Sequence, residues 1–182
     1  IVAPDDLRDH VTKAVRVAGA RRIGHGVGLP AESDAVAVAA EMAAKGVLIE
    51  VNPISNRAIL EVEPQDHPFS WFREMGVPVS LSTDDSGILR SDLSGDYALA
   101  LKMGASYADL KASARNAIAF SFLSGQGLWQ DPNVYRKPVA ACAGQIGNAE
   151  PKGACAALVS GSDKAREQWR HEQMLKAFEA GF

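Results

Sequence analysis

One pattern occurs three times between residues 5 and 83: an amphipathic helix, then a glycine, then a short apolar strand. Glycines at positions 19, 46 and 76 each follow a helical pattern, and glycine readily takes the left-handed backbone that ends a helix. We expect strands over residues 21–26, 47–52 and 77–83. Helices that alternate with apolar strands predict an α/β fold with a parallel sheet.

The helices are expected from apolar residues that recur at helical spacing. The first covers residues 5–18 and the third covers 68–75. Two more follow the last strand, over residues 93–103 and from a capping box at 106–109 onward. A final helix over about 163–180 is expected to bury its apolar side chains, whereas 125–161 reads as irregular. The faces expected to be buried are Leu7, Val11, Ala14, Val15 and Ala18; Val36, Ala39, Ala40 and Ala43; and Leu175, Phe178 and Phe182.

Polar side chains follow all three expected strands. His25 ends the first, the segment 52–56 follows the second, and the adjacent acids Asp84 and Asp85 follow the third. Two acids in a loop are commonly a solvated turn or a helix cap. In sheets covered by helices, however, functional groups gather at the carboxyl ends of parallel strands. Three polar groups at one sheet edge therefore favour a shared site.

Adjacent carboxylates repel each other unless a cation or a proton neutralises one of them. The two acids are therefore expected to have different roles. Asp84 would bind a metal, and Asp85 would accept a hydrogen bond from a substrate. His25, between two glycines, is equally a ligand-facing or a structural histidine.

Other candidate residues have simpler interpretations. His67 precedes a proline at a helix start and is expected to cap or pack, while His10 and His171 are expected to be solvated. Ser55 lacks the G-x-S-x-G setting of a hydrolase nucleophile.

Charge and composition narrow the class of partner. A net charge of −3 gives no electrostatic footprint for nucleic acid, and the apolar runs are too short to cross a bilayer. A small-molecule ligand is therefore favoured. Cys142 and Cys155 are either bridged or free. A bridge would indicate a periplasmic or secreted protein, and free thiols a cytoplasmic one.

Four motifs in one order resemble the adenosine deaminase-like family of the amidohydrolase superfamily. They are R-I-G-H-G at 22–26, N-P-I-S-N at 52–56, H-P-F at 67–69, and S-L-S-T-D-D at 80–85 with Leu93 and Tyr97 after it. The resemblance covers the C-terminal part of such a protein, over its last three strands. It implies the C-terminal portion of a TIM (β/α)8 barrel, about three β/α units, followed by C-terminal helices.

The resemblance also implies a reaction. In the family, zinc lowers the pKa of a bound water, which attacks the C6 carbon of adenosine and yields inosine and ammonia. Carried over by motif, the catalytic residues are His25, Asp84 and Asp85. Asp84 would bind Zn²⁺, Asp85 would accept a hydrogen bond from the purine, and His25 would orient the attacking hydroxide.

Departures from the family pattern bear on substrate and activity. Ser86 stands where proline is common, and Asn52 where cysteine is common, so the exact substrate stays open. The family's His-x-His pair and His-Ala-Gly-Glu segment have no counterpart in this sequence, which is expected to start just downstream of the latter. One zinc ligand falls short of the usual three or four. Alone, the chain is expected to be inactive.

These expectations give a single partial barrel domain over 1–182. Barrel units and flanking helices occupy 1–124, an insertion 125–161, and a C-terminal helix 162–182. The expected partners are a purine nucleoside and the missing N-terminal barrel half, as another segment or chain, or a second copy. Two alternatives stay open: a noncatalytic module that keeps only the barrel framework, and a deaminase of another aminopurine.

Overall fold

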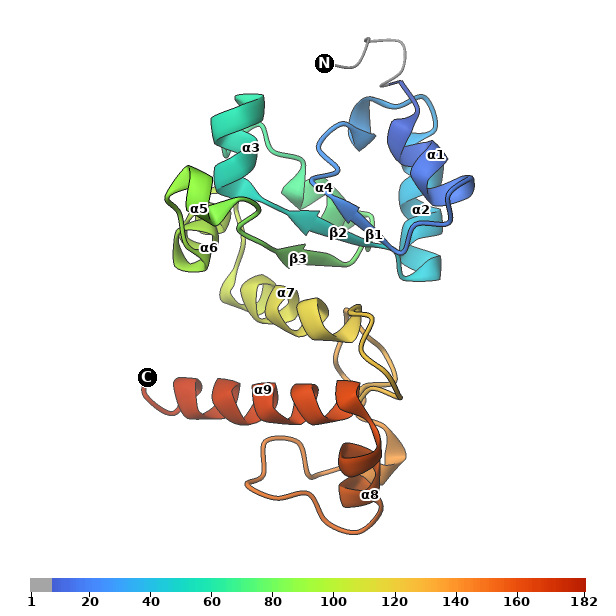
Figure 1. Ribbon diagram of the computed structural model, residues 1–182, viewed down its shortest axis with the longest axis vertical. Helices are drawn as coiled ribbons and strands as arrows, with labels where there is room; N and C mark the ends of the chain where they lie inside the picture. Colours follow the sequence, from blue (N-terminus) through green and yellow to red (C-terminus); the bar gives the residue numbers. More distant parts are fainter. Residues whose placement is uncertain (1–7) are drawn as a thin grey trace. The chain divides into compact units, whose positions relative to one another are not determined.

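The protein, described over residues 8–182 by a computed structural model, contains one parallel sheet of order β1-β2-β3 (Figure 1). The strands are β1 (Arg22–Gly24), β2 (Leu48–Val51) and β3 (Val79–Leu81). Ile23 pairs with Ile49, and Ile49 with Val79. The predicted α/β class with a parallel sheet is confirmed. Each strand is shorter than expected, because it begins later and its regular pairing ends earlier than the apolar pattern indicates.

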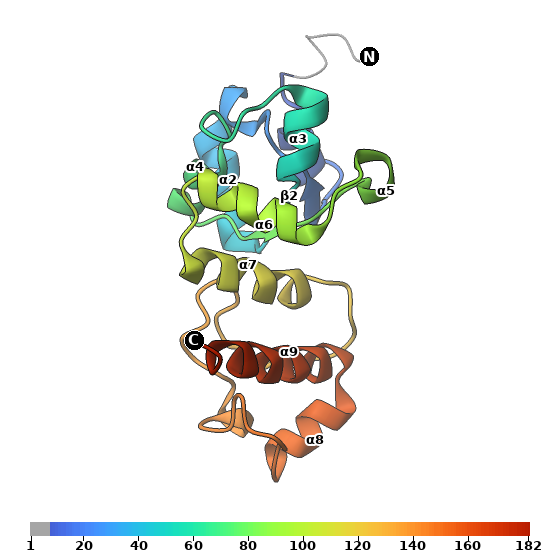
Figure 2. The same cartoon turned by 90° about the vertical axis from the view of Figure 1, so that its left-hand side faces the viewer.

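Helices connect and flank these strands. Helices α2 and α4 join one strand to its parallel neighbour, and both lie on the same side of the strands in Figure 2. Within residues 8–182, no helix is long and apolar enough to span a bilayer. The helices are α1 (His10–Arg16), η2 (Leu29–Ala31), α2 (Ala35–Lys45), α3 (Pro53–Leu60), α4 (Phe69–Glu74), α5 (Ser86–Leu89), α6 (Leu93–Lys102), α7 (Tyr107–Ala119), η3 (Ala140–Cys142), α8 (Ala154–Gly161) and α9 (Asp163–Glu179).

The core of the first part of the chain is built on β2. Leu48 and Ile49 are consecutive and both fully buried. Because consecutive strand residues point to opposite faces, the sheet is covered on both sides. Phe69 and Phe72 of α4 and Met42 of α2 are buried in the same region. This packing holds the strand ends in fixed positions, which a site built on them requires.

The outer edge of β3 is also covered. The backbone N–H of Leu81 donates to the Oγ of Ser113 on α7, at 2.8 Å. A side chain thus takes the place of a further strand at this position, and it leaves less of the sheet edge exposed.

Helix α1 is held by a buried carboxylate from outside the helix. Glu32 is 5 % exposed and accepts hydrogen bonds from the backbone N–H of Val11 at 2.7 Å and of Thr12 at 2.9 Å. The Thr12 hydroxyl donates to it as well, at 2.6 Å. The first N–H groups of a helix lack partners within the helix, so Glu32 acts as its cap.

We therefore expect Glu32→Ala to lower the free energy of unfolding by about 2–3 kcal/mol, because buried donors lose a charged acceptor. Urea titration measures this loss. Glu41→Ala is the matched control, since Glu41 pairs with Arg16 of the same helix at the surface. An equal loss in both variants would contradict the capping role of Glu32.

Several local expectations need correction in this part of the chain. Helix α1 begins at His10, and the expected earlier turn, with Leu7, lies outside the described residues. In α2, Val36 is 63 % exposed, and the buried face consists of Ala35, Val38, Ala39 and Met42. The alanine-rich helix carries two apolar rows, and the row with the larger side chains is buried. Residues 53–60, for which no helix was expected, form helix α3.

The chain divides into two compact units, Ile1–Ala114 and Arg115–Phe182. The second unit has its own buried cluster: Leu128, Val139, Cys142, Cys155, Ala165 and Trp169. Arg115 donates two hydrogen bonds of 2.7 Å to Glu172, and its guanidinium lies 5.0 Å from the ring centroid of Trp129. A paired charge over an aromatic face adds to this packing.

Two helical expectations for this unit were only partly right. The last helix is present as α9, yet Phe178 and Phe182 are 55 % and 96 % exposed, and Trp169 is buried instead. Residues 154–161, expected to be irregular, form helix α8.

Cys142 and Cys155 form a disulfide, with Cα atoms 4.7 Å apart, which settles the alternative between bridged and free thiols. The bridge closes a loop between residues 13 positions apart. Replacing both cysteines by serine should lower the free energy of unfolding of this unit by about 3 kcal/mol, by the chain-entropy relation. Thermal denaturation with and without dithiothreitol measures the loss. Equal melting temperatures of the reduced and oxidised wild-type protein would contradict this stabilising role of the disulfide.

Candidate active site at the carboxyl ends of the strands

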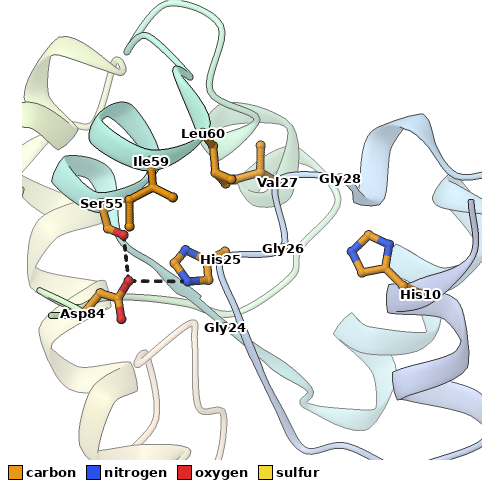
Figure 3. A pocket seen from close by; sticks show the side chains of 10 residues that line it. All are labelled: His10, Gly24, His25, Gly26, Val27, Gly28, Ser55, Ile59, Leu60 and Asp84. Carbon is orange, nitrogen blue, oxygen red and sulfur yellow. Dashed lines mark hydrogen bonds and ion pairs between the residues drawn. The ribbon is translucent and has the colours of Figure 1, made fainter. Parts of the chain in front are cut away.

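Three side chains from the ends of three strands meet at one edge of the sheet (Figure 3). His25 follows β1, Ser55 lies in the first turn of α3 just after β2, and Asp84 follows β3. The Ser55 hydroxyl donates to Oδ2 of Asp84 at 2.6 Å. Nε2 of His25 lies 3.6 Å from the same oxygen. Both contacts go to the same carboxylate oxygen, Oδ2.

The backbone at two of these positions is unusual. His25 has φ 62° and Asp84 has φ 54°, the left-handed region that residues with a side chain rarely adopt. Gly26, next to His25, also has a positive φ, and a Cβ there would lie 3.0 Å from Cδ1 of Ile49. Strained residues of this kind persist where the surrounding fold fixes them, commonly at functional sites.

His25 is held from behind by a buried network. The side-chain amide of Asn56, fully buried on α3, lies between two imidazole rings. Its Oδ1 lies 2.7 Å from Nδ1 of His25, and its Nδ2 lies 2.8 Å from Nε2 of His67. Nδ1 of His67 accepts a hydrogen bond from the backbone N–H of Phe69 at 3.1 Å. Burial lowers the pKa of His67 from 6.5 to about 4, so its ring is neutral at pH 7.

Helix α3 is fixed at its start, which sets the positions of Ser55 and Asn56. Asn52 donates from Nδ2 to the backbone oxygen of Ser82, next to β3, at 3.3 Å. The N–H of Ile54 donates to Oδ1 of the buried Asp96 on α6, at 2.9 Å. Burial raises the pKa of Asp96, and the hydrogen bond from Ile54 opposes that shift. These contacts tie the two strand ends to one helix.

A pocket of about 260 Å³ opens beside His25 and Asp84, close to the size range of small-molecule sites. Figure 3 shows an apolar wall above the polar side chains of the site. It consists of Val27, Ile59 and Leu60. Ile59 and Leu60 are 61 % and 50 % exposed, so this wall is open to solvent. The pocket thus combines an apolar wall with a carboxylate and an imidazole.

His10 also lines this pocket, on the far side of the glycine segment from His25 (Figure 3). His10 is exposed, as expected, and its Nδ1 also lies 3.1 Å from Oε1 of the buried Glu32. His10 also limits the size of residue 28, because a Cβ at Gly28 would lie 2.9 Å from Cε1 of His10.

The predicted site residues differ in placement. His25 and Asp84 are brought together. Asp85, which is exposed like Asp84, precedes α5 and is not among the described residues that line the pocket. Within residues 8–182, no cluster of three or more His, Cys, Asp or Glu side chains could hold a metal ion. His25 and Asp84 alone do not satisfy a zinc ion, which takes three or four ligands.

Sequence reasoning missed the parts of the site that come from α3. Ser55 was considered only as a nucleophile, and Asn56 was seen only as part of a motif. The capping role predicted for His67 is confirmed by its bond from Phe69, but its link to Asn56 was not foreseen. The signal available was a pair of adjacent polar residues shortly after a strand.

Comparison with known proteins identifies relatives of this chain. The model of the family "Adenosine deaminase" matches residues 7–128. The chain is 35% identical over 114 residues to an adenosine deaminase of Shewanella loihica, covering 62% of this chain and 34% of that protein. It is 36% identical over 110 residues to an aminodeoxyfutalosine deaminase of Streptomyces coelicolor, covering 59% and 28%.

A solved structure agrees with these matches. The crystal structure of an adenine deaminase from Arthrobacter aurescens superimposes with a TM-score of 0.56 and 26% identity. The match covers 64% of this chain and 36% of that one. The chain thus spans about a third of the length of the relatives it matches. The family match extends over more than half of the chain and contains His25, Ser55 and Asp84, and this chain belongs to the adenosine deaminase family.

Proposed function

We propose that the full-length protein containing this chain is a zinc-dependent aminohydrolase that deaminates an aminopurine, adenosine or a related nucleoside, and releases ammonia. The chain supplies the last three β/α units of a TIM barrel and the C-terminal helices. The observation that carries the proposal is the contact of His25, Ser55 and Asp84 at the carboxyl ends of neighbouring parallel strands.

Each of these residues has a role in that proposal. Asp84 contributes one carboxylate to the zinc centre, and residues outside this chain complete it. Ser55 donates to Oδ2 of Asp84 and fixes the direction of the carboxylate. His25 orients the attacking water, and Asp85 accepts a hydrogen bond from the purine.

The remaining barrel strands are the partner that the fold requires. The other zinc ligands and the rest of the pocket would come from them, as another segment or chain. The open apolar wall of Ile59 and Leu60 supports this proposal.

The experiment is an ammonia-release assay of the full-length protein with adenosine, adenine and aminodeoxyfutalosine, which the relatives' names suggest. We expect turnover of at least one of these substrates, dependent on zinc. Zinc-free protein that turns over none of them would favour the alternative, a noncatalytic framework.

Ser55→Ala should lower kcat/KM about 10-fold to 100-fold, because removing a residue that orients a metal ligand has effects of this size. Ser86→Ala is a matched control, since Ser86 also lies beside the acids but does not line the pocket. Full activity of Ser55→Ala would exclude its orienting role.

A further inference from the structure

We propose that Asn56 and His67 are positioning residues that set the tautomer of His25, so that the hydrogen of its neutral ring is on Nε2, facing Asp84. The inference deepens the proposed function and depends on it for its catalytic meaning. Its structural basis is the row of contacts that runs from the backbone of Phe69 through His67 and Asn56 to His25.

The first step fixes His67. Its Nδ1 accepts the hydrogen bond from the N–H of Phe69, so that nitrogen carries no hydrogen. The ring is buried and neutral at pH 7, and a neutral imidazole has one N–H. The hydrogen of His67 is therefore on Nε2.

The second step fixes the amide of Asn56. An N–H at Nε2 of His67 needs an acceptor, and the group 2.8 Å away is the Asn56 amide. The amide must then present Oδ1 to His67 and its NH₂ group to His25. In the structure Oδ1 faces His25 and Nδ2 faces His67, so the proposal turns the amide by 180°. The turn exchanges two groups of nearly equal size.

The third step fixes His25. Its Nδ1 lies 2.7 Å from the Asn56 amide, and an NH₂ group there can only donate. Nδ1 therefore accepts, and the hydrogen of neutral His25 is on Nε2. Nε2 lies 3.6 Å from Oδ2 of Asp84, so an N–H attracts the carboxylate where a lone pair would repel it.

The arrangement defines what His25 does in the proposed reaction. A neutral imidazole with hydrogen on Nε2 offers the pocket a donor and cannot accept a proton at that atom. His25 thus orients the attacking water, and another group must take the water's proton. Asn56 is fully buried, and its backbone N–H bonds the oxygen of Asn52 at 2.8 Å, so the donor direction is fixed by the fold.

The test is a long-range ¹H–¹⁵N correlation spectrum of the imidazole rings of the 182-residue chain at pH 7.5. The chain has 4 histidines, and single histidine-to-glutamine variants assign them. We expect His67 and His25 both to show the tautomer with hydrogen on Nε2. Hydrogen on Nδ1 of either ring in the wild type would overturn the proposal.

Asn56→Asp tests causation. An ionised carboxylate can only accept, so with Asp ionised at position 56 Nδ1 of His25 must become protonated, and its ¹⁵N signal should shift strongly upfield. Asn52→Asp is the control, because it adds the same charge on the same segment but contacts Ser82 and not His25. A residue with a merely structural role would not move the hydrogen. An unprotonated Nδ1 of His25 in folded Asn56→Asp would refute the assignment.

If Asn56→Asp does not fold, a scalar coupling across the hydrogen bond decides the matter in the wild type. We expect coupling between the amide nitrogen of Asn56 and Nδ1 of His25, and its absence would contradict the proposal. None of these measurements uses deaminase activity. Failure of the proposed function would appear in the ammonia assay alone, and failure of this inference in the spectra alone.

Discussion

Asp84→Asn in the full-length protein is expected to lower kcat/KM for purine deamination at least about 1000-fold, which corresponds to the several kcal/mol that a catalytic metal supplies. The asparagine amide is a poorer metal ligand than the carboxylate. It also lacks the negative charge of the Asp84 carboxylate, whose Oδ2 lies near His25 and accepts a hydrogen bond from Ser55. Steady-state ammonia release measures the activity, and elemental analysis measures zinc.

Asp85→Asn is the matched control because it makes the same charge change one residue away. We expect it to keep its zinc and to weaken purine binding, seen as a raised KM. Zinc content and turnover equal to wild type in Asp84→Asn would disprove the role given to Asp84. Loss of zinc in Asp85→Asn alone would show that the two roles are exchanged.

Acidification is expected to destabilise the first unit through His67. The pKa of His67 is 6.5 in the unfolded chain and about 4 in the folded protein, because burial disfavours the charged form of the ring. Between these values the unfolded state binds more protons, so stability falls as the pH falls from about 6.5 to 4 and is fully present above that range. The difference corresponds to about 3 kcal/mol.

Urea titrations at a series of pH values, followed by the methyl signals of the buried Ile49, measure this loss. Carboxylates also titrate near pH 4, so the comparison is with His67→Gln, which cannot titrate but keeps an amide to meet Asn56. Between pH 6.5 and 4, we expect the free energy of unfolding of the variant to fall less steeply with falling pH than that of the wild type. The same slope in both proteins would contradict the account of His67.

The parallel sheet could be predicted from the sequence because its signals are local. Gly46 and Gly76 end their helices with positive φ, and apolar runs follow each of them. The meeting of His25 with Asp84 also followed from a general rule, since parallel strands bring their carboxyl ends to one edge. The catalytic roles of His25, Asp84 and Asp85 stay predictions.

Other features depend on contacts that no local pattern encodes. The buried face of α2 was misassigned because alanines make both faces apolar, and only packing decides between Val36 and Val38. The bond between Asn56 and His67 requires α3 to return toward the start of α4. Cysteine spacing alone left the disulfide open, and an amphipathic pattern did not show that Phe178 would be exposed.

The most direct test of the central claim is a crystal structure of the full-length protein with anomalous diffraction data at the zinc edge. The account predicts a zinc ion about 2.0–2.2 Å from a carboxylate oxygen of Asp84, with Nε2 of His25 beside the open coordination position. Zinc bound without Asp84, or a deaminase active with His25 and Asp84 far apart, would contradict it.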